Sequence, residues 1–140
     1  MNNRYTFRGK GNPKYNDGEW YYGHLIYDGS DYQIVDPEYG SCKRTVIPET
    51  VGQCTGLKDK NGKLIFEGDI VESRASENQE NWKKWVVGFS DGSFCFNREI
   101  SKKRKHKYEE NLLCVDEIEL YGLTVIGNIH DNPEFAEVER

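Results

Sequence analysis

Residues 55–71, TGLKDKNGKLIFEGDIV, decide the fold of this chain. Asn61-Gly62 stands near the centre of the stretch, and this dipeptide favours the positive-φ backbone of a tight β-hairpin turn. Apolar side chains lie on both sides of the turn, so we predict two antiparallel strands at 55–59 and 63–67. Gly68 interrupts the second strand, and a third is predicted to begin at Asp69. We therefore expect a protein built from short strands and tight turns.

The rest of the chain carries the same signals. β-Branched and aromatic residues outnumber Ala, Leu and Met, and 14 glycines supply turn positions. Asp91-Gly92 marks a second hairpin. Residues 108–116 fit either a helical turn or an irregular loop, and Asn132 is placed to cap a short helix that Pro133 begins. Further strands are predicted at 4–9, 19–27, 32–35, 45–47, 69–72, 82–89, 93–96 and 123–129.

Length and composition limit the classes of protein that the chain can belong to. It has 140 residues, 31% of them charged, and a formal net charge of −5, which suits one domain or two small lobes. No apolar run approaches the roughly 18 residues that span a bilayer. The polar start at residues 1–4 leads into no apolar signal-peptide core. We expect a cytoplasmic protein with no membrane partner.

Several blocks of the sequence resemble the YopX family, small proteins of phages and prophages. The main block is residues 48–71, PETVGQCTGLKDKNGKLIFEGDIV, and the flanking blocks are YTFRGK at 5–10, Glu19-Trp20 with Tyr22-Gly23, and VIGNIHDNPE at 125–134. Cys54 departs from the family pattern, which usually has an aromatic or apolar residue there, and residues 72–122 match only loosely. The resemblance implies an SH3-like β-barrel, and it brings no enzymatic activity or agreed functional residues with it.

These observations together predict a mostly β fold in two parts. Residues 48–140 form an SH3-like barrel domain that ends in the short C-terminal helix. Residues 1–47 form an N-terminal β segment that packs on the barrel, because they contain too few apolar side chains for a core of their own. We expect this segment not to be stable alone.

The polar residues of the chain point away from catalysis. A carboxylate cluster could hold a divalent cation only if side chains from several strands converged, and we favour backbone capping, above all by Asp69. The cysteines lack metal-ligand spacing and resemble small buried apolar residues. His130-Asp131 has no marked nucleophile, and no phosphate-binding glycine loop is present. We predict no enzyme, metal or cofactor. The carboxylates concerned are Glu49, Asp59, Glu67 and Asp69, and the cysteines are Cys42, Cys54, Cys95 and Cys114.

A basic run at residues 102–107 is the sharpest local feature. A flexible basic loop would bind nucleic acid weakly and without sequence preference. The alternative is a solvated hairpin tip whose charges pair with the acidic C-terminal segment, and the overall negative charge favours it. The candidate nucleic-acid residues are Lys102, Lys103, Arg104, Lys105 and Lys107.

The chain also has more aromatic residues than the inward face of a small barrel needs, 13% of the total. Alternate residues of a strand point to opposite faces, so some rings either lie under the N-terminal segment or line a partner groove. The candidate partner-binding residues are Trp20, Tyr22, Trp82 and Trp85. Our functional hypothesis is a non-enzymatic phage or prophage accessory protein that binds an unknown host or phage protein.

Overall fold

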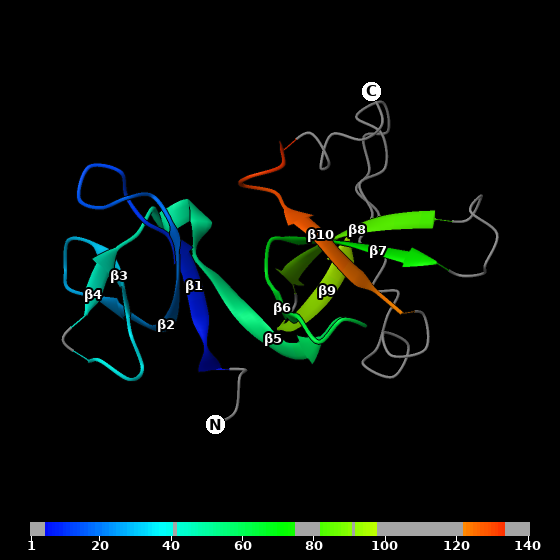
Figure 1. Cartoon of the computed structure of the whole chain (residues 1–140), viewed down its shortest axis with the longest axis horizontal. Helices are drawn as coiled ribbons and strands as arrows, with labels where there is room; N and C mark the ends of the chain where they lie inside the picture. Colours follow the sequence, from blue (N-terminus) through cyan, green and yellow to red (C-terminus); the bar gives the residue numbers. More distant parts are fainter. Residues whose placement is uncertain (1–4, 41, 75–81, 91, 98–121, 134–140) are drawn as a thin grey trace. The chain divides into compact units, whose positions relative to one another are not determined.

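The computed structural model describes residues 5–40, 42–74, 82–90, 92–97 and 122–133 (Figure 1). The regular secondary structure of these residues is almost entirely antiparallel β-strand, which confirms the mostly β prediction. The chain divides into two compact units after Gly56, inside one long strand. The predicted division into 1–47 and 48–140 stays a prediction. In the part of the chain that the structure describes, no helix is long and apolar enough to cross a membrane.

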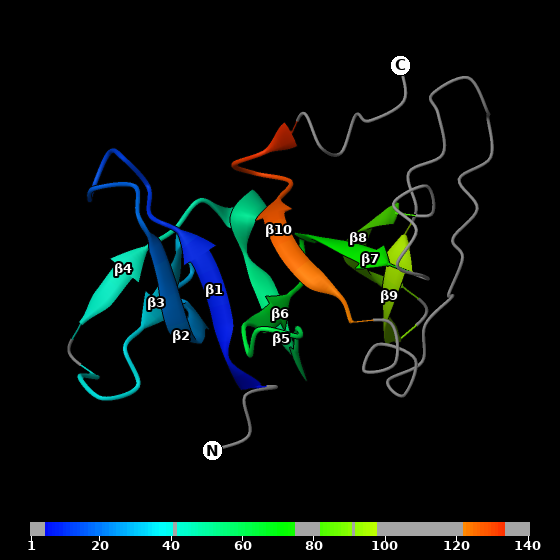
Figure 2. The ribbon, with the colours of Figure 1, turned by 45° about the vertical axis from the view of Figure 1, so that its right-hand side comes forward.

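The first unit is an antiparallel sheet with the strand order β4-β3-β2-β1-β5, and β1 to β4 lie side by side (Figure 2). Ile34, Val46 and Cys54 are its fully buried apolar residues. A 3-10 turn, η2 (Pro48–Thr50), leads into the last strand. The strands are β1 (Phe7–Lys10), β2 (Trp20–Tyr27), β3 (Tyr32–Val35), β4 (Lys43–Thr45) and β5 (Gly52–Lys58).

The second unit begins at Leu57, near the end of β5, and contains the larger core. Four of its strands form an antiparallel sheet in the order β10-β7-β8-β9, and β6 is hydrogen-bonded to β5. Each fully buried aliphatic side chain of such a core contributes about 1.5–3 kcal/mol to folding. The strands are β6 (Leu64–Phe66), β7 (Asp69–Arg74), β8 (Trp82–Ser90), β9 (Ser93–Asn97) and β10 (Thr124–Asn128). The core residues are Ile65, Val71, Trp85, Val87, Phe96 and Leu123.

Both predicted hairpins are present. Gly62 adopts φ 82° in the β5–β6 turn, and β8 pairs with β9 so that Ser90 is opposite Ser93. Within the described residues the strands form two antiparallel sheets, and β9 does not pair with β10 to close a barrel. The predicted C-terminal helix lies outside the described residues, which end at Pro133, and so does the ambiguous segment 108–116.

Candidate binding surface of the first unit

Trp20 and Tyr22, two of the predicted partner-binding residues, lie on the same face of β2 because they are two positions apart on one strand. Arg8 of β1 is directly opposite Tyr22, and its guanidinium carbon lies 4.8 Å from the centroid of the Trp20 ring. This cation–π contact holds the half-buried indole in place. Tyr22 is 50% exposed, so the phenol is the part of this face that a partner can reach.

The other two predicted aromatic residues belong to β8 in the second unit. Trp85 is directly opposite Val71 and is only 4% exposed, so its ring belongs to the core. The backbone of Trp82 pairs with Arg74, and its side chain lies outside the described part of the structure. The structure therefore brings Trp20 and Tyr22 together and leaves Trp85 enclosed in the other unit.

The most exposed aromatic contact in the described chain was not identified from the sequence. Tyr27 and Tyr32 are directly opposite each other at the end of the β2–β3 hairpin, with ring centroids 4.8 Å apart and ring planes tilted by 32°. Tyr27 is 59% exposed and Tyr32 is 38% exposed. The available signal was the turn sequence Asp28-Gly29-Ser30-Asp31, which has one tyrosine on each side. A hairpin register that pairs the two tyrosines follows from that turn.

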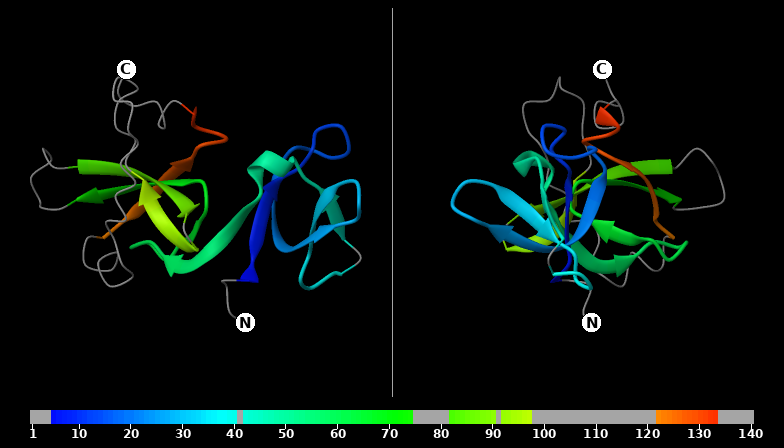
Figure 3. Two further views of the ribbon diagram at one scale, coloured as in Figure 1. Left: turned by 180° about the vertical axis from the view of Figure 1, so that it is seen from behind. Right: turned by 60° about the vertical axis from the view of Figure 1, so that its left-hand side comes forward.

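The turn between these tyrosines is held by one carboxylate. Asp28 Oδ1 accepts hydrogen bonds from the backbone N–H of Ser30 at 2.9 Å and of Asp31 at 2.7 Å. The Asp28 N–H donates to the Asp31 carbonyl at 3.2 Å, and Gly29 takes the φ of 94° that a side chain would disfavour. Hydrogen bonds from the Asp31 and Ser30 amides hold the pKa of Asp28 below its usual value. The two rings are thus carried on a turn with a defined backbone, which Figure 3 shows projecting from the first sheet.

The exposed tyrosines of the described residues lie in the first unit, and the two tyrosines of the second unit, Tyr108 and Tyr121, lie outside the described residues. The large apolar side chains exposed in the described residues are six tyrosines and one phenylalanine, and every tyrosine among them precedes residue 40. Single exposed apolar residues are ordinary on a protein surface, but the paired rings at the hairpin end form a contiguous patch. The exposed residues are Tyr5, Tyr15, Tyr22, Tyr27, Tyr32, Tyr39 and Phe89.

The predicted capping role of the acidic residues is confirmed for Asp69. Its Oδ2 accepts the Phe66 N–H at 2.7 Å. Glu49 is exposed in η2, and Glu67 is half-buried between β6 and β7. No group of three or more His, Cys, Asp or Glu residues in the described ranges is arranged to hold a metal ion.

Asp59 is a second acidic residue whose carboxylate accepts hydrogen bonds from backbone amides. Its Oδ1 accepts the N–H groups of Asn61 at 2.8 Å and Lys63 at 2.9 Å, and its Oδ2 accepts that of Val125 at 3.0 Å. Burial raises the pKa of Asp59, but these three hydrogen bonds, with help from the Lys63 charge, leave the pKa below its usual value. The carboxylate therefore serves the fold, linking the β5–β6 turn to β10.

The cysteine prediction holds for part of the set. Cys54 and Cys95 are buried, as expected of small apolar residues. Cys42 is free and exposed, so the expectation of burial is wrong there; it lies in the loop before β4, where its N–H donates to the Tyr39 carbonyl. Cys114 and the basic run 102–107 lie outside the described residues. Nucleic-acid binding by that run stays a prediction.

Residues 6–137, nearly the whole chain, match the sequence model of the YopX protein family. The chain belongs to the YopX family, as the sequence blocks predicted. Among solved structures it is similar to the crystal structure of protein EF1440 from Enterococcus faecalis, with 26% identity and a TM-score of 0.51. That likeness covers 94% of this chain and 97% of the other. No curated protein matches the chain.

Proposed function

We propose that this YopX-family chain is a non-enzymatic accessory protein of a phage or prophage, and that it acts by binding another protein through the β2–β3 hairpin. The observation that carries the proposal is the exposed Tyr27–Tyr32 pair, whose rings are in contact. The absence of catalysis is proposed because Asp59 and Asp69 are engaged by backbone amides. The phage origin is taken from the family resemblance.

Tyrosine is suited to this role for physical reasons. Its ring buries a large apolar area on binding, its hydroxyl remains hydrogen-bonded, and only two side-chain torsions lose freedom. Because Asp28 already fixes the turn, little backbone entropy remains to be lost when a partner docks. Asp28 and Asp31 border the rings and are negatively charged. The complementary surface is therefore a protein patch with an apolar centre and a basic rim.

The test compares partner capture by matched variants of the full chain. The Tyr27→Ser/Tyr32→Ser variant removes both rings, and Phe89→Ser removes an exposed ring from the second unit as a control. We expect a bacterial protein that is enriched by the wild type and by the control to be lost from the double variant. The candidate is then purified, and its direct affinity must fall at least tenfold with the double variant. Equal affinity for all three chains would contradict the proposal.

The finer architecture is also a proposal. Residues 48–140 are proposed to form an SH3-like barrel followed by a short helix after Asn132. Its support is the antiparallel order β10-β7-β8-β9 and the YopX membership. An experimental structure that traces residues 98–121 tests it. A backbone path that leaves the sheet open between β9 and β10 would contradict the barrel.

A further inference from the structure

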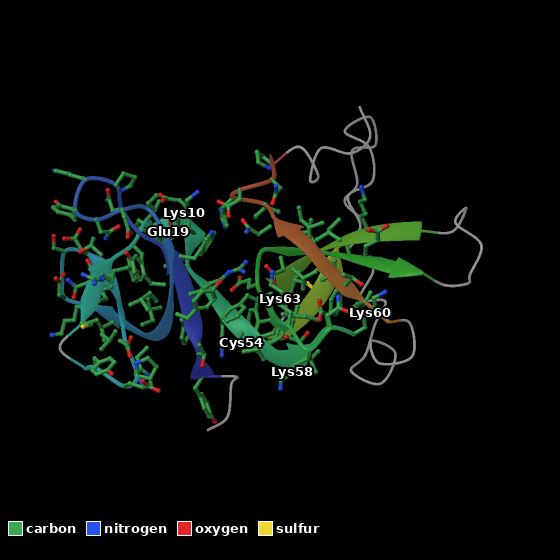
Figure 4. The ribbon with its side chains drawn as sticks, viewed as in Figure 1. Lys10, Glu19, Cys54, Lys58, Lys60 and Lys63 are labelled. Atoms are coloured by element: carbon green, nitrogen blue, oxygen red, sulfur yellow. The ribbon has the colours of Figure 1, made fainter. Side chains whose placement is uncertain are left out.

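Three exposed lysines lie within six residues at the β5–β6 turn of the second unit. Lys58 is the last residue of β5, Lys60 is in the turn, and Lys63 comes just before β6; all three are labelled in Figure 4. We refer to residues 58–63 as the lysine hairpin.

The one acidic residue of the lysine hairpin, Asp59, offsets these charges only in part, and it does so through its interaction with the Lys63 charge. Asp59 is 7% exposed, and its carboxylate is turned toward the amides of Asn61, Lys63 and Val125. Within the part of the chain that the structure describes, no salt bridge holds the ammonium groups of Lys58, Lys60 or Lys63. The turn therefore presents three exposed lysines to solvent, and residues 58–63 have a formal net charge of +2.

The backbone beneath the lysines is fixed at several points. The Asp59 N–H donates to the Lys63 carbonyl at 2.8 Å, and the Gly62 N–H donates to the Asp59 carbonyl at 3.0 Å. The Lys60 N–H donates to the Leu123 carbonyl at 2.9 Å, which ties the tip to the residue before β10. A Cβ built on Gly62 would meet nothing within 4 Å, so the outer side of the turn is open to a ligand. The three charges are carried on a turn whose backbone is already ordered.

The chemistry of the tip distinguishes between classes of partner. Lysine is depleted in protein–protein interfaces, whose affinity depends on aromatic and arginine anchors. Between Lys58 and Lys63 the exposed side chain other than lysine is that of Asn61, and Gly62 adds none. Lysine and asparagine side chains are common ligands of nucleic-acid phosphates. The turn also has no aromatic ring on which an unpaired base could stack, which disfavours single strands.

We propose that the lysine hairpin binds the phosphate backbone of duplex DNA without sequence preference. This site is independent of the tyrosine pair and lies in the other unit. If each lysine neutralises one phosphate, the slope of log K against log salt receives about −2.7 from the hairpin, at −0.9 per phosphate. Such binding is strong at low salt and weak at physiological salt.

The test is a fluorescence-anisotropy titration of the full chain with labelled 20-base-pair DNA, the corresponding single strand, and poly-glutamate as a competitor. Lys58→Ser/Lys60→Ser/Lys63→Ser is compared with Lys14→Ser/Lys43→Ser/Arg44→Ser, which makes the same change of net charge on exposed residues of the first unit. At low salt we expect the hairpin variant to bind duplex at least tenfold more weakly than wild type, with a salt slope smaller by 2–3. The control should stay within twofold of wild type.

Each other outcome overturns the inference. These outcomes are no duplex binding by wild type at low salt, unchanged binding by the hairpin variant, equal loss in both variants, or preference for the single strand or for poly-glutamate. Loss of binding only when the basic residues of 102–107 are replaced would also overturn it. If the triple variant melts at a lower temperature than wild type, the single variant Lys60→Glu repeats the comparison, because only the Lys60 backbone forms the bond to Leu123.

Discussion

Replacing Asp59 with alanine tests how much one carboxylate contributes to the stability of the second unit. The substitution removes the acceptor for three backbone N–H groups, those of Asn61, Lys63 and Val125. Two of these donors lie in an exposed turn, where water replaces the lost acceptor. The third belongs to half-buried Val125 on β10, where an unsatisfied donor costs about 1–3 kcal/mol. With the loss of two charge-assisted bonds, we expect the free energy of unfolding to fall by about 3 kcal/mol.

The pH dependence provides a second and independent readout. Because the folded-state pKa of Asp59 is lower than its usual value, its stabilising effect is complete above about pH 4 and is lost as the pH falls through the folded-state pKa. The difference between wild type and Asp59→Ala should therefore shrink as the pH is lowered from 7 towards 2.

The assay is urea unfolding followed by tryptophan fluorescence at several pH values, since Trp85 lies in the affected core. Asp28→Ala is the matched control: it also removes a carboxylate that accepts backbone bonds, but at an exposed turn of the first unit, and it should cost less. A loss below about 0.5 kcal/mol at pH 7, within the range of ordinary surface substitutions, would refute the reasoning. So would a difference that does not change with pH.

Two further substitutions test packing, one in each unit. Gly23→Ala would place a Cβ against the carbonyl oxygen of Val35 on β3, so we expect the first unit to lose its folded circular-dichroism signal. Gly40→Ala, in open space, should change stability by less than about 0.5 kcal/mol. Equal behaviour of the two variants would contradict the close approach at Gly23. Trp85→Ala should destabilise the second unit by about 3–5 kcal/mol in urea titration, as expected of a buried aromatic; a loss under 1 kcal/mol would place its ring outside the core.

Local chemistry made the hairpins and the Asp69 cap predictable from sequence. Asn61-Gly62 supplies a positive φ that few other residue pairs tolerate, and Asp69 follows Gly68 where a short carboxylate reaches a nearby amide. These features depend on residues a few positions apart. They do not require knowledge of how the strands are ordered.

The faces of the strands could not be assigned in the same way. Alternation along β8 does not say which face of the strand meets the core, so residue type alone does not distinguish a core position for Trp85 from a partner surface. The Val125 amide that Asp59 binds is 66 residues away in sequence, and no local pattern predicts that contact. Exposure of Cys42 depends on the loop before β4 and has no signal in residue type alone.

The most direct test of recognition by the β2–β3 hairpin is site-specific photocrosslinking in bacterial cells. A benzophenone amino acid replaces Tyr27 in one variant and Phe89 in another, so that rings of similar exposure from the two units, 59% and 53%, are compared. The account predicts one discrete protein adduct from position 27, abolished by Tyr32→Ser, and no such adduct from position 89. The same adducts from both positions, or none from position 27, would contradict it.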